Sequence, residues 1–198
     1  MLPPDIDAQS RNRLPLPSRS DFSAEDVDVY DSVADPKGGT IRGLIGPGGI
    51  GLHSPKLAKL QRPVGRYLRH DAPISPRIRE TAILITAREC DSKFEWAAHE
   101  PEGLKCGVPP AVIDVIKHRK STAGLEDDDD LIITLGREMF GARKVAPATF
   151  ARALKRFGRS TLVDLVSLMG NYAGTAALLC AFDMQLDDGP HVAQLPVP

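Results

Sequence analysis

The sequence has few aromatic residues and few cysteines. Aromatic residues make up 5% of the chain and apolar residues 42%, so we expect a core built mainly from aliphatic side chains. Its three cysteines, Cys90, Cys106 and Cys180, form neither an even disulfide framework nor the ligand spacing of a metal site. This usage fits a reducing, cytoplasmic setting best, and we expect neither a metal nor a cofactor.

The sequence also has almost no net charge. Because 25 basic and 26 acidic residues leave a formal charge of −1, we expect neither a nucleic acid nor an anionic membrane as the main partner. We find no apolar segment of the signal-peptide type near residue 1. The longest apolar stretch, around Leu178 and Leu179, is bracketed by Asn171 and Asp183, and we expect it to be too short to span a bilayer.

Strand patterns are absent as well, since apolar residues recur at helical spacing and do not alternate. The 198 residues suffice for one compact domain with its own core. We therefore predict an all-α domain of seven or eight helices over residues 23–186. Residues 1–22, rich in proline and charge, are expected to lie extended, and residues 187–198 to form an irregular tail.

In two of the expected helical segments, a proline or a glycine predicts where the helix bends or stops. The helix after Ser54-Pro55 has an apolar stripe at helical spacing, and Pro63 within it predicts a kink or a break. The stripe consists of Leu57, Leu60, Val64 and Leu68. Near the end of the chain, one helix is expected to stop at Gly158 and a longer one to follow Ser160. Small residues in this last helix, at 170, 173, 174 and 177, predict close packing in the core or between subunits.

Residues 75–107 predict two helices joined by a tight turn. Ser75-Pro76 combines a capping side chain with a proline at the first helical position. The residues Cys90-Asp91-Ser92 interrupt the pattern, and Asp91 or Ser92 can cap the second helix. Gly107 is a plausible C-terminal stop.

This helical hairpin contains a possible acid/base group. Glu95 and His99 are four residues apart and share one helix face. Glu80 lies on an apolar face of the first helix, where an unpaired carboxylate is costly to bury. If the two helices pack antiparallel, Glu80 can approach His99. The alternative is an ion pair between Glu80 and Arg79 or Arg88, with a purely structural role for His99.

These residues carry a resemblance to a known family. The pattern consists of Arg77-x-x-Glu80, a histidine nineteen residues later, and Gly107-Val108. It resembles the carboxymuconolactone decarboxylase family, whose superfamily also contains the alkylhydroperoxidase D-like peroxidases. The resemblance covers residues 54–118 and extends to residues 146–184, which are similar to the closing helices of many members.

The redox pair of those peroxidases is missing from this chain. The peroxidases carry a glutamate, then C-x-x-C, then a histidine four residues after the second cysteine. In this sequence the glutamate corresponds to Glu80 and the histidine to His99, while the two cysteine positions correspond to Ser92 and Glu95. The chain is thus similar to a family member that keeps the proton-handling residues and lacks the C-x-x-C pair.

The resemblance implies an alkylhydroperoxidase D-like helical bundle, often assembled as a homo-oligomer such as a trimer or hexamer. It also implies a carbon–carbon lyase that decarboxylates a small carboxylated lactone or keto acid by proton transfer, without a cofactor. His99 would act as general acid/base, and Glu80 would orient it or share its proton. Glu95 would be a second acid/base or a substrate contact.

Four further residues are candidates for contact with the substrate. Arg42 lies in a glycine-rich loop, residues 38–51, and a guanidinium group matches a carboxylate in geometry. This loop lacks the G-K-[ST] ending and the preceding strand of a nucleotide-binding loop. His53 follows the loop, and Trp96 and Tyr172 are candidates to line a pocket or to belong to the core.

Two other functions stay open at this point. A thiol peroxidase needs a low-pKa thiolate and a resolving cysteine, but Cys90 and Cys106 are sixteen residues apart and Cys180 lies among leucines. A non-catalytic helical oligomer that binds a small molecule is the other alternative, because a fold does not determine a function.

Overall fold

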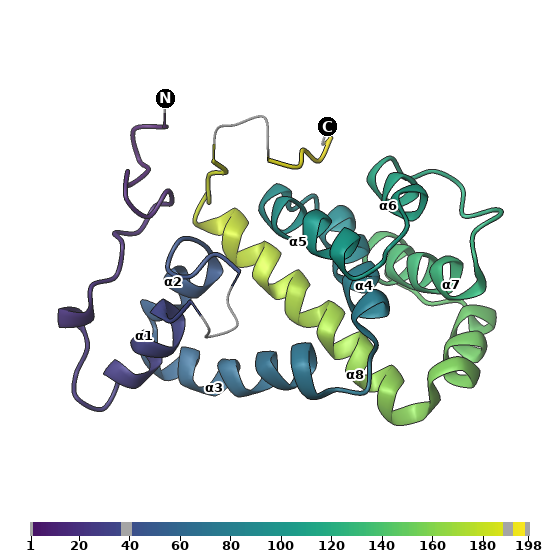
Figure 1. Cartoon of the computed structure of the whole chain (residues 1–198), viewed down its shortest axis with the longest axis horizontal. Coiled ribbons are helices and arrows are strands. Elements are labelled where there is room, and N and C mark those ends of the chain that lie inside the picture. Colours follow the sequence, from purple (N-terminus) through teal and green to yellow (C-terminus); the bar gives the residue numbers. More distant parts are fainter. Residues whose placement is uncertain (1, 37–40, 188–191, 197–198) are drawn as a thin grey trace.

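The computed structural model describes residues 2–36, 41–187 and 192–196 (Figure 1). These residues form eight α-helices and no strand, which confirms the all-α class. Two glycines of the glycine-rich loop, Gly38 and Gly39, lie outside the described residues. The α-helices are α1 (Val27–Ala34), α2 (Pro47–Leu52), α3 (Pro55–Arg66), α4 (Pro76–Glu89), α5 (Lys93–Lys105), α6 (Pro110–Lys117), α7 (Asp127–Gly136) and α8 (Pro147–Ala181). A 3-10 turn, η1 (Arg19–Asp21), and two π-helical turns, η2 (Tyr67–Asp71) and η3 (Arg137–Ala142), complete the helical elements.

Helix α4 is the centre of the fold. It contacts α5, α6, α7 and α8, and Figure 1 shows these helices grouped around it. Ile83, Leu84 and Ile85 are consecutive and fully buried, so α4 is surrounded on all sides. A helix that is apolar all round has to be enclosed by other elements. A polar side chain on α4 therefore needs a partner inside the protein.

The predicted hairpin of α4 and α5 is present, with the expected ends. The Ser75 hydroxyl accepts a hydrogen bond from the backbone N–H of Ile78, and Pro76 occupies the first turn. Asp91 has a φ of 49° in the turn, and Ser92 precedes α5. Gly107 follows the end of α5 with a φ of 85°, a conformation that glycine adopts without strain.

Helix α8 is bent at the predicted place. Gly158 has φ 72° and ψ 175°, so the chain turns there and a long second part continues diagonally across the molecule (Figure 1). Among the described helices, α8 has the length and apolar composition to cross a membrane. Of its apolar 18-residue stretch, 39% is buried inside the protein. The helix is longer than the apolar stretch between Asn171 and Asp183 considered in the sequence, and a core helix can have the same length and composition. Leu162, Leu165 and Leu168 are buried in the core cluster, as in a core helix of a globular domain.

Helix α3 differs from the sequence prediction in two ways. Pro63 does not end the helix, which continues to Arg66. Pro63 is exposed, and a carbonyl that loses its partner to a proline on this side can bond to water. Of the predicted apolar stripe only Leu68 is buried, while Leu57, Leu60 and Val64 are exposed.

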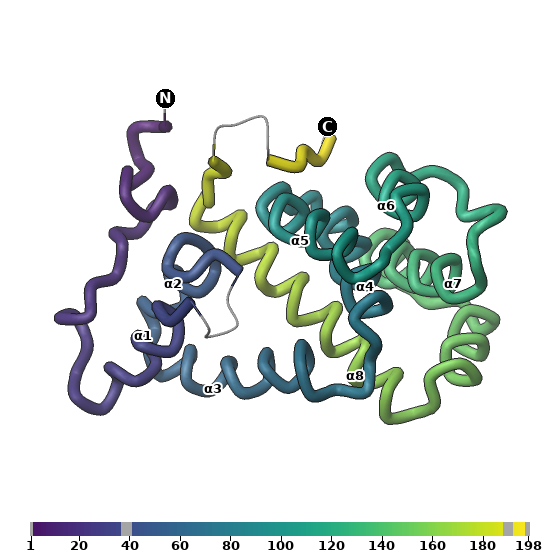
Figure 2. Tube along the Cα trace, in the orientation of Figure 1, coloured from purple at the N-terminus to yellow at the C-terminus, as the bar shows by residue number. Residues whose placement is uncertain are grey.

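The N-terminal segment lies next to the end of α8 and the residues that follow it. The backbone N–H of Arg13 donates to the carbonyl of Phe182, and that of Gln185 donates to the carbonyl of Arg11. Figure 2 shows the N-terminal segment on the same side of the molecule as the end of α8. Residues 2–22 form turns and η1 rather than a continuous extended segment, and Ser10 is buried there.

Candidate active site

A pocket of about 160 Å³ lies between the glycine-rich segment, η2, α5 and α8. The prediction that residues 38–51 form a loop is wrong for residues 47–51, which belong to helix α2. The wall of the pocket combines apolar side chains with acidic, basic and amide groups. The lining residues are Ile41, Arg42, Gly43, Pro47, Gly48, Arg69, Phe94, Glu95, Ala98, His99, Asn171, Tyr172 and Thr175. Four of the residues predicted from the sequence to act on a substrate thus meet at one cavity: His99, Glu95, Arg42 and Tyr172.

A buried carboxylate supports the imidazole at the pocket. The Nδ1 atom of His99 lies 2.7 Å from Oε2 of Glu80, and both side chains are almost completely buried. The antiparallel packing of α4 and α5 therefore produces the predicted contact between Glu80 and His99. An ionised carboxylate can only accept, so Nδ1 carries the hydrogen and Nε2 is left toward the pocket.

The ionisation of Glu80 is favoured by its neighbours. Burial pushes the pKa of Glu80 upward, but the hydrogen bond from His99 and the charges of His99, Arg79 and Arg69 outweigh it. The resulting pKa lies below its ordinary value. Nε of Arg79 is 3.5 Å from Oε1 of Glu80, whereas Arg88 pairs with Asp91. The structural ion pair with Arg79 thus coexists with the Glu80–His99 contact.

The pKa of Glu95 is shifted in the opposite direction from that of Glu80. Its Oε2 lies 3.7 Å from Nε2 of His99, on the other side of the ring from Glu80. Burial raises the pKa of Glu95, and the negative charge of Glu80 adds to this, while the charges of His99 and Arg69 oppose it. The imidazole therefore lies between an ionised carboxylate and a carboxyl group that tends to hold its proton.

Tyr172 closes one side of this arrangement. Its ring meets the His99 ring edge-on, with centroids 5.1 Å apart and an interplanar angle of 87°. Burial raises the pKa of the Tyr172 phenol, so the hydroxyl stays protonated at neutral pH. Tyr172 is 6% exposed and also belongs to the core cluster, so it both lines the pocket and packs against the core.

Arg42 lies on the pocket wall, as expected for a substrate contact, but it has an acidic partner in the chain. Its Nη1 atom is 2.9 Å from Oδ2 of Asp187, in the segment after α8. Its guanidinium carbon is 5.8 Å from the centre of the Phe94 ring, which also lines the pocket. Arg42 is therefore held by a carboxylate and an aromatic face.

Two predicted contacts lie away from the pocket. Trp96 is fully buried, donates its indole N–H to Glu100 and has the ammonium group of Lys117 over its ring. It follows Glu95 directly on α5, so it points to a different face of the helix. His53 is exposed, and its Nε2 is 3.0 Å from the carbonyl of Pro15. Neither residue remains a candidate for substrate contact.

Arg69 is the main pocket residue that the sequence analysis did not find. It lies in η2, and its positive charge acts to lower the pKa of the buried acids Glu80, Glu95 and Tyr172, although burial prevails for the last two, whose pKa values are raised. A π-helical turn shifts the positions that follow it relative to an α-helix, so helical spacing does not predict which residues of η2 face the pocket. Phe94 and Asn171 also line the pocket and were not predicted.

Comparisons with known proteins add no relative. No protein-family model matches the chain, and no curated protein or solved structure is significantly similar to it. The resemblance to the carboxymuconolactone decarboxylase family thus stays a prediction that rests on the quoted residues. Within the described part of the chain, no group of three or more His, Cys, Asp or Glu side chains is placed to hold a metal ion.

Proposed function

We propose that this protein is a cofactor-independent carbon–carbon lyase that decarboxylates a small carboxylated lactone or keto acid. The observation that carries the proposal is the buried contact of 2.7 Å between Glu80 and His99 at a pocket that also contains Glu95. The resemblance to the carboxymuconolactone decarboxylase family supports it. The alkylhydroperoxidase D-like fold, a cytoplasmic setting and assembly of several copies belong to the same proposal.

The charges at the pocket suit the steps of a decarboxylation. When the bond between the substrate and its carboxylate breaks, carbon dioxide leaves and the electron pair remains as an enolate. The positive charge of Arg69 stabilises this negative charge in a partly enclosed site. A proton then has to reach carbon. The Glu95 carboxyl group can deliver it directly, or it can pass its proton to Nε2 of His99, which Glu80 orients, and the resulting imidazolium then gives that proton to carbon.

The central test measures turnover of γ-carboxymuconolactone. We expect its ultraviolet absorbance to fall on addition of the purified protein. His99→Ala and Glu80→Gln should each slow this reaction by about 10²–10⁴-fold, the usual contribution of a general acid or base. Their melting curves should show that the variants still fold.

The control is His118→Ala, since His118 is exposed and contacts Asp114 on α6 rather than the pocket. It should retain full activity. Wild-type-like turnover in His99→Ala or Glu80→Gln would remove that residue from the mechanism. Binding of the lactone without any turnover would favour the non-catalytic binding protein instead.

A thiol peroxidase finds less support in the structure. Burial is the largest influence on both Cys90 and Cys106, and it raises the pKa of each thiol. A raised pKa disfavours the thiolate on which peroxide reduction depends. Rapid formation of a Cys90–Cys106 disulfide on peroxide addition would nevertheless restore this alternative.

A further inference from the structure

The buried carboxylate that supports His99 has a second partner on its other oxygen. Oε2 of Glu80 lies 2.7 Å from Nδ1 of His99, while Oε1 lies 3.5 Å from Nε of Arg79. Arg79 directly precedes Glu80 on α4, so its long side chain turns back toward the neighbouring carboxylate. The two oxygens of Glu80 are thus held by two different groups.

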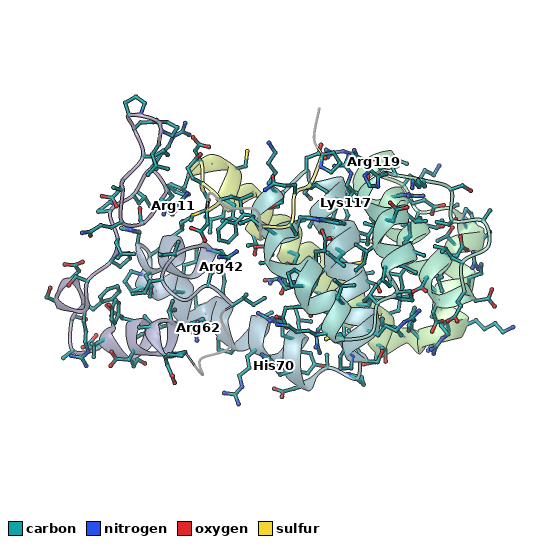
Figure 3. All side chains as sticks on the ribbon, turned by 45° about the horizontal axis from the view of Figure 1, so that its top comes forward. Arg11, Arg42, Arg62, His70, Lys117 and Arg119 are labelled. Carbon is teal, nitrogen blue, oxygen red and sulfur yellow. The ribbon has the colours of Figure 1, made fainter. Side chains whose placement is uncertain are left out.

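Arg79 lies between this buried pair and the surface. The Arg79 side chain is 18% exposed, whereas that of Glu80 is 4% exposed. Desolvation and the charges of Arg69 and Arg79 lower the pKa of His70 in η2, which Figure 3 shows at the edge of the molecule. Arg79 is not among the described residues that line the pocket, so it can influence a substrate there only through other residues.

The charge of Arg79 acts directly on the ionisation of Glu80. Burial is the largest influence on the pKa of Glu80 and raises it. The hydrogen bond from His99 and the charges of the neighbouring cations outweigh burial and lower the pKa below its ordinary value. Among the two arginines that contribute, Arg79 has a larger influence than Arg69. Loss of the Arg79 charge would therefore raise the pKa of Glu80.

The other titratable groups near Glu80 cannot replace this charge. Glu95 lies on α5, Cys106 follows that helix and Tyr172 lies on α8. Burial raises the pKa of each of these groups, and the negative charge of Glu80 adds to this. All three are acids, so none of them can supply a positive charge to the carboxylate.

We propose that Arg79 is a positioning residue for the acid/base pair at the pocket. Its guanidinium group holds Oε1 of Glu80, so that Oε2 stays on Nδ1 of His99 and the carboxylate stays ionised. An ionised carboxylate can only accept, which keeps the hydrogen of the imidazole on Nδ1 and leaves Nε2 toward the pocket. This inference rests on the proposed function and deepens it, because it adds a third member to the Glu80–His99 pair.

Carbon-13 NMR of the glutamate side-chain carboxyl groups measures the ionisation of Glu80 directly, and Glu80→Gln identifies its signal. In Arg79→Gln the midpoint of the Glu80 titration should lie about 1 pH unit higher than in the wild type, the lower range for loss of a neighbouring opposite charge. Arg79→Lys keeps the positive charge and should restore most of the wild-type midpoint. Circular dichroism at each pH shows whether the proteins are folded.

Turnover of γ-carboxymuconolactone gives a second measurement. Protonation of Glu80 should slow the reaction, so the decline of kcat on acidification should begin about 1 pH unit higher in Arg79→Gln than in the wild type. KM at neutral pH should be unchanged, because Arg79 does not line the pocket. A purely structural role would lower the melting temperature without moving the pH at which kcat declines.

Arg66→Gln is the matched control, because it removes the same charge from a nearby position. Arg66 is exposed and, like Arg79, contributes to lowering the pKa of His70. The cations that act on Glu80 are His99, Arg79 and Arg69. Arg66→Gln should therefore leave both the Glu80 midpoint and the pH profile of kcat as in the wild type.

A double-mutant cycle tests the same contact through stability. Glu80→Gln removes the charge that Arg79 holds, so Arg79→Gln should lower the melting temperature less in this background than in the wild type. Equal losses in the two backgrounds would overturn the assignment of Arg79. An unchanged Glu80 midpoint in Arg79→Gln would overturn it as well, and so would a midpoint in Arg79→Lys raised as far as in Arg79→Gln.

The NMR titrations and the melting curves need no turnover. A protein that shows the expected titrations but decarboxylates nothing would refute the lyase and leave the role of Arg79 at Glu80 intact. Turnover with the same pH profile in Arg79→Gln and the wild type would do the reverse, since it would keep the lyase and remove Arg79 from its mechanism.

Discussion

Two buried glutamates on opposite sides of one imidazole have opposite pKa shifts. Glu80 receives a hydrogen bond from His99, and this bond together with nearby positive charges keeps its pKa low despite burial. For Glu95 burial is the largest influence, and its pKa is raised. When the surroundings lower the pKa of one acid and raise the pKa of another, the first is suited to act as a base and the second as an acid. Glu80 therefore favours its ionised form, and Glu95 keeps its proton to a higher pH than an ordinary glutamate does.

This assignment predicts how stability depends on pH. A raised folded-state pKa means that the folded protein holds the proton of Glu95 more tightly than the unfolded chain does. The stabilisation is complete below the ordinary glutamate value of 4.5 and is lost as pH rises through the folded-state pKa. Glu95→Gln mimics the protonated form. Its melting temperature should therefore rise relative to the wild type as pH increases above 4.5, by about 2–4 °C for each kcal/mol.

Melting curves from pH 4.5 to pH 9 provide this measurement. Glu102→Gln serves as the control, because Glu102 is on the same helix and pairs with Lys105 at the surface. Its difference from the wild type should not grow over this range. A constant difference for Glu95→Gln as well would show that folding does not raise the pKa of Glu95, and the role of Glu95 as an acid would fall.

At the residue scale, the sequence was sufficient where local spacing determines geometry. The i, i+4 relation of Glu95 and His99 and the hairpin of α4 and α5 bring Glu80 to the imidazole, as predicted. Arg69 and Asp187 were missed, because their places depend on a π-helical turn and on contacts between the N-terminal segment and the residues after α8. Such contacts leave no periodic signal in the sequence.

At the element scale, a glycine determines how closely two helices approach each other. Gly136 is buried at the end of α7, and a Cβ added there would lie 2.7 Å from Cγ1 of Ile85 on α4 and 3.2 Å from Cε of Met169 on α8. These neighbours are themselves fully buried and have no room to move. The contact of α7 with α4 thus requires a residue without a side chain.

We expect Gly136→Ala to destabilise the protein by about 1–3 kcal/mol, the usual cost of overpacking a core. Gly170→Ala is the matched control on α8, since Gly170 is exposed and nothing lies within 4 Å of the added Cβ. This change should stabilise the helix by up to about 1 kcal/mol. Chemical denaturation measures both values. A Gly136→Ala variant as stable as Gly170→Ala would show that α7 and α4 can separate without cost.

The ends of the helices were more predictable than their faces. Ser75-Pro76, Gly107 and Gly158 act through their own backbone and side-chain chemistry, so the sequence shows where elements start, stop or bend. The burial of a face depends on whether another element covers it. The apolar stripe of α3 has the pattern of a core helix, yet Leu60 is 67% exposed.

Most of the apolar stripe on α3 is left uncovered by the described residues of the single chain. Its exposed members, Leu57, Leu60 and Val64, are continued by Tyr67 in η2 at intervals of three, four and three residues, and all four are exposed. This spacing is typical of a helix that packs along a second helix. Together with the assembly that the family resemblance implies, it supports a second copy of this chain as the partner of α3.

Light scattering coupled to size-exclusion chromatography tests this assembly. We expect the wild type to have a mass of at least two chains of 21.4 kDa each. Leu60→Gln should shift the population toward the single chain, because apolar area buried between copies contributes about 25 cal/mol per Å². Leu104→Gln on α5 is the control, since Leu104 is 47% exposed but lies outside the stripe, and it should keep the wild-type mass. A wild type that elutes as a single chain at high concentration would refute the assembly, whatever its activity.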